Sequence, residues 1–326
     1  MNVKDALLKT LAGSGEEYIS GAALAEKLGV SRNAVWKAVK SLEGEGYVIE
    51  SVAARGYRLS AQSNRLSAEL ISSRLNTVSL GRNIEVYDVI DSTNNAAKER
   101  AAAGAPHGTV IAADRQTMGR GRLGRTFVSP SGTGIYMSVL VRPDLSLEDS
   151  GLITSTAAVA AAEAVESLCG QDVCIKWVND LYINGKKICG ILTEASLGLE
   201  MKSLDHAVIG IGINVRSIRK CFDSELSAIA SSIEDETGCQ LDRSQLCAAV
   251  LDRLEYWLGH ISKREFLPEY RRREILTGNA ITASIGGKQV TGKALGIDDN
   301  ANLIMELPGG EVRHLGSGEA NLCRII

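Results

Sequence analysis

Residues 173–195 read VCIKWVNDLYINGKKICGILTEA and decide how the largest part of the chain folds. The pair Asn184-Gly185 is a strong signal for a two-residue hairpin turn, because both central positions of such a turn require a positive φ angle. Runs of apolar residues lie on either side of the turn, as expected for paired strands. We therefore predict adjacent strands of one sheet at residues 173–177, 181–183, 187–195 and 207–215.

The sheet is predicted to extend toward the N-terminus. Strand-like runs occur at residues 84–90, 109–113 and 134–142, and residues 150–169 have the spacing of a long amphipathic helix. Because strand-like and helix-like segments are mixed, the sequence predicts an α+β domain with a mixed sheet over residues 68–265.

A glycine-arginine run, Gly119-Arg120-Gly121-Arg122-Leu123-Gly124-Arg125, lies between the second and third of these strands. Arginine presents a fork of donors that matches phosphate or carboxylate, and glycine lets backbone N–H groups approach the same anion. The run does not open a Rossmann helix, and the chain has no G-x-x-x-x-G-K-[ST] phosphate loop. By itself the run fits an exposed basic linker or an RNA-binding tract as well as an anion-binding loop of an enzyme.

The first 60 residues have the pattern of a winged helix-turn-helix. Residues 3–11, 21–28 and 32–42 show helical spacing, with Gly29 ending the second helix and Ser31 placed to cap the third. Two β-type runs at residues 47–51 and 56–59 follow, which adds a wing. We place this domain at residues 1–62, followed by an aperiodic linker. The buried stripe of the third helix is predicted to consist of Ala34, Val35, Ala38, Val39 and Leu42.

The charge of this domain favours DNA binding by the third helix. Residues 1–60 hold eight Lys or Arg and seven Asp or Glu, yet residues 31–40 contain three basic residues and no acid. A local basic helix is the electrostatic footprint that DNA recognition requires. The alternative is a protein-interaction module in which Trp36 packs into the core. The predicted DNA-contacting residues are Ser31, Arg32, Asn33, Lys37 and Lys40.

The overall composition is that of a globular protein. The chain has 326 residues, 44% of them hydrophobic and 23% charged, and a net charge of −3, so any DNA contact must be local. Its seven cysteines form no C-x-x-C pair, which favours free thiols in a reducing cytoplasm. Lys4, Asp5 and Lys9 argue against a signal peptide, and Glu163 and Glu166 interrupt the longest apolar helix. The sequence predicts a cytoplasmic protein without a membrane contact.

Several motifs, taken together, resemble the biotin–protein ligase family. They are Asp91-Ser92-Thr93-Asn94, the glycine-arginine run, Lys176-Trp177-Val178-Asn179-Asp180, residues 184–192 and Gly210-Ile211-Gly212-Ile213-Asn214. The order of several motifs is far more specific than any one of them. With the winged helix, the chain resembles the bifunctional members that also repress biotin synthesis. The resemblance implies a central fold related to class II synthetases and lipoate ligases, and a small SH3-like β-barrel at residues 275–326.

The resemblance also implies the reaction. Biotin and ATP, which carries Mg²⁺, give biotinyl-5′-adenylate, and the biotinyl group passes to a lysine of the biotin carboxyl carrier protein of acetyl-CoA carboxylase. With adenylate bound, the protein would act as a homodimer on operator DNA. No metal site made by the protein itself is predicted. Since negative charge builds on the transferring phosphoryl group, arginine and lysine side chains must stabilise it.

By the same resemblance, each candidate residue receives a role. The catalytic residues are Lys187, Arg120, Arg122 and Asp180. The biotin-binding residues are Ser92, Thr93, Asn94, Gln116, Arg120, Gly121, Arg122 and Lys187. The nucleotide-binding residues are Arg122, Arg125, Lys187 and Asn214.

Each of these assignments has an ordinary structural alternative. Ser92 and its neighbours fit a plain helix N-cap, and Asp180 and Asn214 fit turn or strand-end residues with local hydrogen bonds. Strand alternation sends Lys186 and Lys187 to opposite faces, so one of them is expected to be a solvated lysine, and we expect it to be Lys186. Two other functions remain: a lipoate–protein ligase-like enzyme and a biotin-sensing repressor without catalysis.

Overall fold

The computed structural model describes residues 2–15, 17–60, 63–146, 148–197, 204–285 and 288–323. Residues 61 and 62, where the predicted N-terminal domain ends, lie outside these ranges, as do residues 324–326 at the end of the predicted C-terminal domain.

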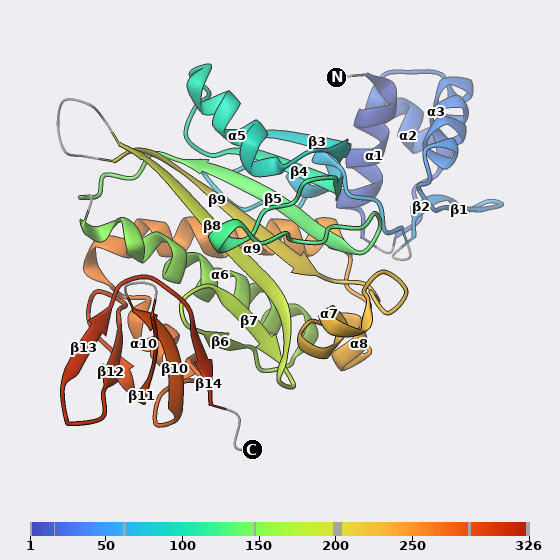
Figure 1. Cartoon of the computed structure of the whole chain (residues 1–326). Coiled ribbons are helices and arrows are strands. Elements are labelled where there is room, and N and C mark those ends of the chain that lie inside the picture. Colours follow the sequence, from blue (N-terminus) through green and yellow to red (C-terminus); the bar gives the residue numbers. More distant parts are fainter. Residues whose placement is uncertain are drawn as a thin grey trace.

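A seven-stranded mixed sheet forms the centre of the protein (Figure 1). Its strand order is β3-β4-β5-β9-β8-β7-β6, with β3 parallel to β4 and the other neighbours antiparallel. The strands are β3 (Asn83–Ile90), β4 (Thr109–Gln116), β5 (Gly134–Val141), β6 (Cys174–Lys176), β7 (Asp180–Ile183), β8 (Lys186–Leu197) and β9 (Leu204–Asn214).

The hairpin at Asn184-Gly185 is confirmed. Asn184 has a φ of 50° and Gly185 a φ of 76°, the left-handed conformations that a tight hairpin between twisted strands requires. The adjacency of the four strands predicted around it is also confirmed. The register of β7 against β8 shifts between Leu181 and Tyr182, which marks a bulge next to the hairpin.

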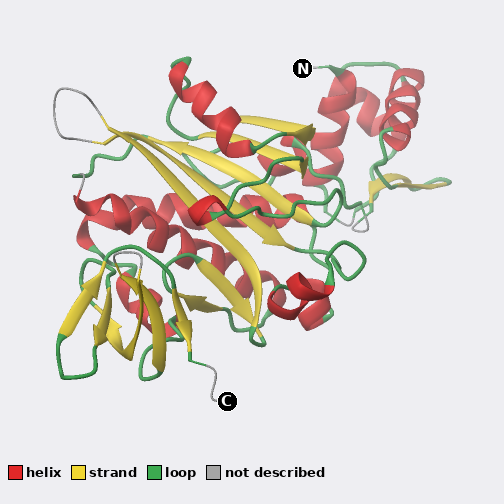
Figure 2. Cartoon of the chain, viewed as in Figure 1, coloured by secondary structure: helices red, strands yellow, loops and turns green. Residues whose placement is uncertain are grey.

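Helices cover both faces of the sheet (Figure 2). α6 (Leu152–Cys169) and α9 (Arg243–Gly259) cover one face, and α5 (Thr93–Ala102) lies on the other. Residues of β5 alternate accordingly: Met137 packs in the core with α6 and α9, and Leu140 packs with α5. Residues Asp149–Cys169 are long and apolar enough to cross a membrane, but 67% of the most apolar window of that helix is buried inside the protein.

The N-terminal segment forms the expected winged helix. Ser31 accepts a hydrogen bond from the backbone N–H of Ala34 and so caps the third helix, and Gly29 ends the second in the left-handed conformation. The predicted buried stripe is found except at Ala34, which is only half-buried. The elements are α1 (Val3–Gly13), α2 (Gly21–Leu28), α3 (Arg32–Gly44), β1 (Ile49–Val52) and β2 (Gly56–Leu59).

The C-terminal segment forms a five-stranded antiparallel sheet with the order β13-β12-β11-β10-β14. The indole N–H of Trp177 donates to the carbonyl oxygen of Ala301 at 3.0 Å, which ties this sheet to the central domain. Its strands are β10 (Ala280–Ile285), β11 (Lys288–Ile297), β12 (Leu303–Glu306), β13 (Val312–Leu315) and β14 (Ala320–Leu322). The short helices α4 (Ala68–Ser72), α7 (Ser224–Ile229), α8 (Ile233–Thr237) and α10 (Leu267–Arg273) complete the fold.

The described part of the linker after the winged helix is held against the central domain. Arg243, whose side chain is 3% exposed, donates to the backbone oxygen and to Oδ1 of Asn64. The same guanidinium donates to Asp114 Oδ1 at 2.6 Å and to the carbonyl oxygen of Gly134 at 3.0 Å. A buried arginine needs such partners, because an unpaired buried charge is strongly destabilising. The linker is therefore anchored to the ends of β4 and β5.

Candidate active site

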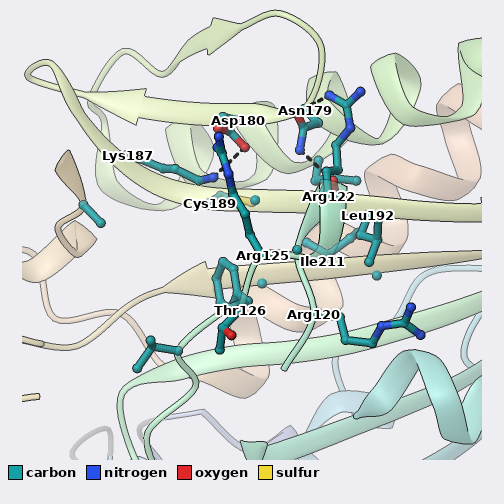
Figure 3. Close-up of a pocket in the computed structure, with 18 of the residues that line it drawn as sticks. Arg120, Arg122, Arg125, Thr126, Asn179, Asp180, Lys187, Cys189, Leu192 and Ile211 are labelled. Atoms are coloured by element: carbon teal, nitrogen blue, oxygen red, sulfur yellow. Dashed lines mark hydrogen bonds and ion pairs between the residues drawn. The ribbon is translucent and has the colours of Figure 1, made fainter. Parts of the chain in front are cut away.

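One pocket brings together every residue predicted for the ligase chemistry. It lies on the α5 face of the sheet, next to the loop that contains the glycine-arginine run (Figure 3). Its lining includes Ser92, Thr93, Asn94, Gln116, Arg120, Gly121, Arg122, Arg125, Asp180, Lys187 and Asn214.

Lys187 and Asp180 form an ion pair inside this pocket. Lys187 Nζ lies 2.7 Å from Asp180 Oδ1, and both side chains are partly buried. Lys187 is the second residue of β8 and Asp180 is the first of β7, so the hairpin places the cation and the acid side by side (Figure 3). The pair presents one positive and one negative group to the same region of the pocket.

Lys186 is not the solvated lysine that the sequence predicted. It does leave the pocket, as strand alternation requires, but its Nζ donates to the carbonyl oxygens of Ser227 at 3.0 Å and Ala228 at 2.7 Å. Residues 227 and 228 are 41 and 42 positions further along the chain. The sequence could not indicate this contact, because nothing local in it specifies where that distant segment returns.

Arg122 and Arg125 point toward the end of the pocket that holds Asp180. Arg122 donates to Asn179 Oδ1 at 3.1 Å, and burial lowers the pKa of its guanidinium. Arg125 forms two hydrogen bonds, at 2.9 and 2.6 Å, with the Glu319 carboxylate of the C-terminal domain, and they raise the pKa of Arg125. Burial acts to raise the pKa of Glu319, but the bonds from Arg125 hold that pKa below its usual range. The C-terminal domain therefore closes one side of the pocket.

Arg120 lies apart from the other two arginines. Its guanidinium donates to Asn95 Oδ1 at 3.2 Å and lies 3.6 Å from Glu194 Oε1. Figure 3 shows it pointing away from Lys187 and Asp180. The arginines of the run thus divide between two regions of the pocket, with Arg122 and Arg125 on the side of Asp180 and Arg120 beside Glu194.

A network of buried hydroxyl and amide groups lies at the start of α5. Gln116 Oε1 accepts from the backbone N–H of Thr93 at 2.9 Å and from its hydroxyl at 3.1 Å. The Ser138 hydroxyl, which is fully buried, lies 2.8 Å from Thr93 Oγ1. Ser92 occupies the N-cap position of α5 but makes no side-chain cap hydrogen bond. Gln116 instead accepts from a backbone N–H at the start of the helix, and so takes the capping role that a plain N-cap would give to Ser92.

Asn94 is fully engaged in this network. Its Nδ2 donates to Glu194 at 2.9 Å and to the carbonyl oxygen of Leu192 at 3.3 Å, and its Oδ1 accepts from Ser138 at 2.6 Å. A Cβ atom at Gly210 would lie 2.1 Å from Asn94 Oδ1, so this position must be glycine. Asn94 therefore shapes the pocket by fixing its neighbours.

Asn214 keeps one free acceptor at the end of β9. Its Nδ2 donates to the carbonyl oxygen of Ser231 at 2.9 Å, and the residue is 4% exposed. No described residue donates a hydrogen bond to its buried Oδ1. A buried amide oxygen without a protein donor is suited to a donor group on a ligand.

The predicted DNA-contacting residues share one exposed surface of α3. Arg32, Asn33, Lys37 and Lys40 are exposed, and Trp36 is 50% exposed, so Trp36 is not a core residue. Lys40 Nζ lies 2.7 Å from Glu43 Oε2, and this ion pair partly neutralises the charge of the lysine. The Ser31 oxygen is used by the helix cap.

Comparisons with known proteins show the family of the chain. Residues 86–214 match the biotin/lipoate A/B protein ligase family, residues 4–58 match an HTH domain, and residues 277–322 match the biotin protein ligase C-terminal domain. The bifunctional ligase/repressor BirA of Bacillus spizizenii is 38% identical, with 93% of this chain and 94% of that protein covered. The chain belongs to the family of bifunctional ligases and repressors represented by BirA.

Two further relatives agree with the family assignment. The BirA of Escherichia coli is 32% identical over 90% of this chain and 89% of that protein. A biotin protein ligase of Aquifex aeolicus, solved in complex with biotin and ATP, is 29% identical with a TM-score of 0.63 and covers 74% of this chain and 99% of that one. The predictions that this chain is a biotin–protein ligase and a DNA-binding repressor are thereby confirmed.

Sequence reasoning missed four residues that build the site of this ligase. Asn179 orients Arg122, Ser138 and Glu194 hold the network at α5, and Lys176 lines the pocket while donating to Asn321 Oδ1. Asn179 and Lys176 belong to the motif at residues 176–180, so that motif was the available signal. Ser138 lies within β5 and Glu194 within β8, both in mostly apolar strands, and nothing local in the sequence distinguishes them as site residues.

Proposed function

We propose that this ligase activates biotin with MgATP and transfers the biotinyl group to a lysine of the biotin carboxyl carrier protein of acetyl-CoA carboxylase. In the first step, a carboxylate oxygen of biotin bonds to the α-phosphorus of ATP and pyrophosphate leaves. In the second, the lysine amine bonds to the biotinyl carbonyl carbon and AMP leaves. The observation that carries the proposal is the convergence of Lys187, Arg122 and Arg125 on the end of one pocket that holds Asp180.

The cations would supply the charge stabilisation that the first step requires. Biotin carboxylate and ATP are both anions, and negative charge develops on the phosphoryl group during transfer. Lys187 would bridge the carboxylate and the α-phosphate, and Arg122 and Arg125 would bind phosphate oxygens. The partly buried position of Arg122 strengthens such an interaction, because less water screens it than at an exposed site.

Asp180 would serve the second step. Its carboxylate lies beside Lys187, and so beside the position that we assign to the mixed anhydride. From there it can accept a hydrogen bond from the attacking amine and take its proton as the amide forms. Lys187, which would stabilise charge in the first step, and Asp180, which would take a proton in the second, are thus neighbours.

The two ends of the pocket would bind different parts of the adenylate. Thr93 and Gln116, which line the pocket, offer hydroxyl and amide partners for the ureido ring of biotin, and Ser138 bonds Thr93 from behind. The backbone of Gly121 in the loop would bond biotin, and Ser92 and Asn94 line the same end of the pocket. The free Oδ1 of Asn214 would accept from the amino group of adenine.

Magnesium would enter with ATP. In the part of the chain that the structure describes, no group of three or more His, Cys, Asp or Glu side chains could hold a metal ion. Mg²⁺ commonly binds through substrate phosphates and one or two carboxylates and keeps several waters.

Repression would depend on adenylate and on a homodimer. A single α3 with few cations binds DNA weakly, so two helices on a two-fold operator are needed for useful affinity. Ordering of the glycine-arginine loop around the adenylate would favour the dimer, because a mobile loop adds an entropy cost to an interface.

A pyrophosphate-release assay tests the proposal. Biotin with MgATP should release pyrophosphate, and lipoate at the same concentration should not. Release with lipoate alone would indicate the lipoate ligase-like activity, and no release with either acid would indicate a sensing repressor without catalysis.

A further inference from the structure

Lys186 holds the C-terminal end of a helix that forms part of the pocket wall. Its Nζ donates to the carbonyl oxygens of Ser227 and Ala228, in the last turn of α7 (Ser224–Ile229). Carbonyl groups in the last turn of a helix lack intrahelical partners and carry the negative end of the helix dipole. A lysine ammonium, with three donors and a positive charge, satisfies both needs.

The helix that Lys186 holds contributes apolar side chains to the pocket. Leu226 and Ile229 of α7, with Phe222 just before it, line the same pocket as Lys187 and Asn214. α7 has only six residues, and none of them is fully buried. Helices this short are not stable by themselves, so the position of α7 depends on its anchors. At its N-terminal end Asp223 caps the helix by accepting from the backbone N–H of Leu226 at 2.8 Å.

The hairpin that carries Lys187 also bonds the chain on the C-terminal side of α7. The backbone N–H of Ser231 donates to the carbonyl oxygen of Lys187 at 2.8 Å, and Asn184 Nδ2 donates to the carbonyl oxygen of Glu236 at 3.2 Å. Lys186 adds the contact to α7 itself. One short hairpin therefore presents Lys187 to the pocket and also bonds α7 and the chain after it, which form part of the pocket wall.

We infer that Lys186 is a positioning residue for the nucleotide. It fixes α7 to the hairpin, so that the apolar wall and the cation Lys187 keep one relative position around ATP and the adenylate. The inference rests on the proposed function. The biotin end is built from Thr93, Gln116 and Ser138 on α5, β4 and β5, and none of these bonds the hairpin tip. The effect of Lys186 is therefore selective for ATP.

Lys186→Met tests this selectivity, because it removes the ammonium group and retains an unbranched apolar stem. We expect the KM for ATP to rise about tenfold, because α7 loses both charge-assisted hydrogen bonds from the lysine ammonium. Biotinyl-adenylate formed in advance should dissociate faster by a similar factor, and the KM for biotin should stay unchanged. Lys186→Arg keeps charge and donors and should restore most of the ATP affinity.

Lys220→Met, at an exposed position shortly before α7, is the matched control and should leave both KM values unchanged. Asp223→Ala loosens the opposite end of α7 and should reproduce the ATP-selective effect, which keeps the test decisive if Lys186→Met does not fold. Equal changes in both KM values, or no change in either, would overturn the inference. Wild-type protein that releases no pyrophosphate would instead overturn the proposed function.

Discussion

Lys187 Nζ and Asp180 Oδ1 lie 2.7 Å apart and join β8 to β7 within the pocket. The bulge between Leu181 and Tyr182 lies between these residues, where the register of the two strands shifts. A change at Lys187 therefore also removes the ion partner of Asp180, and its effects on the two proposed steps must be measured separately.

Replacing Lys187 by alanine is expected to slow adenylation by about 10² to 10³ while the protein stays folded. A preorganised positive group aimed at developing negative charge contributes on the order of 3 to 4 kcal/mol to lowering a barrier. Single-turnover pyrophosphate release measures the first step, and transfer from added biotinyl-adenylate measures the second. Lys263→Ala, at an exposed site, is the control. Unchanged pyrophosphate release in Lys187→Ala would remove Lys187 from the mechanism.

Arg122→Ala is expected to release biotinyl-adenylate about tenfold faster. The variant loses a partly buried guanidinium that Asn179 holds in place, and a charge-assisted hydrogen bond to a phosphate is worth about 1.5 to 3 kcal/mol. The dissociation rate of adenylate formed in advance is the measurement, with Arg313→Ala on the C-terminal sheet as the control. An unaltered rate would mean that Arg122 does not retain the product of the first step.

Gly210→Ala is expected to raise the KM for biotin at least about tenfold. The added Cβ would lie 2.1 Å from Asn94 Oδ1 and would displace an amide that bonds Ser138 and Glu194. Adding Asn94→Ala should recover part of the affinity, because the clash disappears, and such non-additivity is typical of residues in contact. Gly259→Ala, where a Cβ meets nothing within 4 Å, is the control. Normal biotin binding by Gly210→Ala would show that the position of Asn94 is unimportant.

The double substitution Arg32→Ala, Lys37→Ala is expected to weaken DNA binding and to lower its salt dependence, by about 0.9 in the log–log slope for each DNA phosphate that is no longer neutralised. Binding to promoter DNA of the biotin-synthesis genes is measured with and without biotin and MgATP, while sedimentation follows dimerisation. Lys9→Ala on α1 is the control.

By linkage, if adenylate strengthens the dimer, the dimer holds adenylate more tightly. Dimerisation and DNA affinity that do not change when biotin and MgATP are added would contradict this coupling. DNA binding by the double variant that equals wild type would exclude α3 as the DNA-reading helix.

Glu255 is expected to stabilise the fold in a pH-dependent way. Burial acts to raise its pKa, but hydrogen bonds from the Ser79 hydroxyl and from the backbone N–H groups of residues 78–80 lower the pKa from 4.5 to about 2. Because the folded-state pKa is depressed, this stability is fully present above pH 4.5 and is lost as the pH falls toward 2. The difference in unfolding free energy between wild type and Glu255→Gln should therefore shrink across this range. A constant difference would show that the carboxylate is not responsible.

Much of the fold follows from local signals in the sequence. The Asn184-Gly185 turn sets the hairpin because its backbone angles suit few other residues, and Ser31 and Gly29 set the limits of two helices because their caps are local. The motifs also predicted site residues that the fold brings together, since all of them line one pocket.

What each side chain contacts was decided by the tertiary structure. Arg125 bonds Glu319 across 194 positions, and Lys186 bonds a helix end across 41 and 42. Neither contact leaves a periodic trace in the sequence, because it depends on where two distant segments meet. Asn94 is predicted from the sequence to bind biotin, and only the fold shows that its amide also bonds Ser138 and Glu194. Residue types and short-range backbone geometry thus determined the elements and the contents of the site, while packing between distant segments determined which of its polar groups remain free for a substrate.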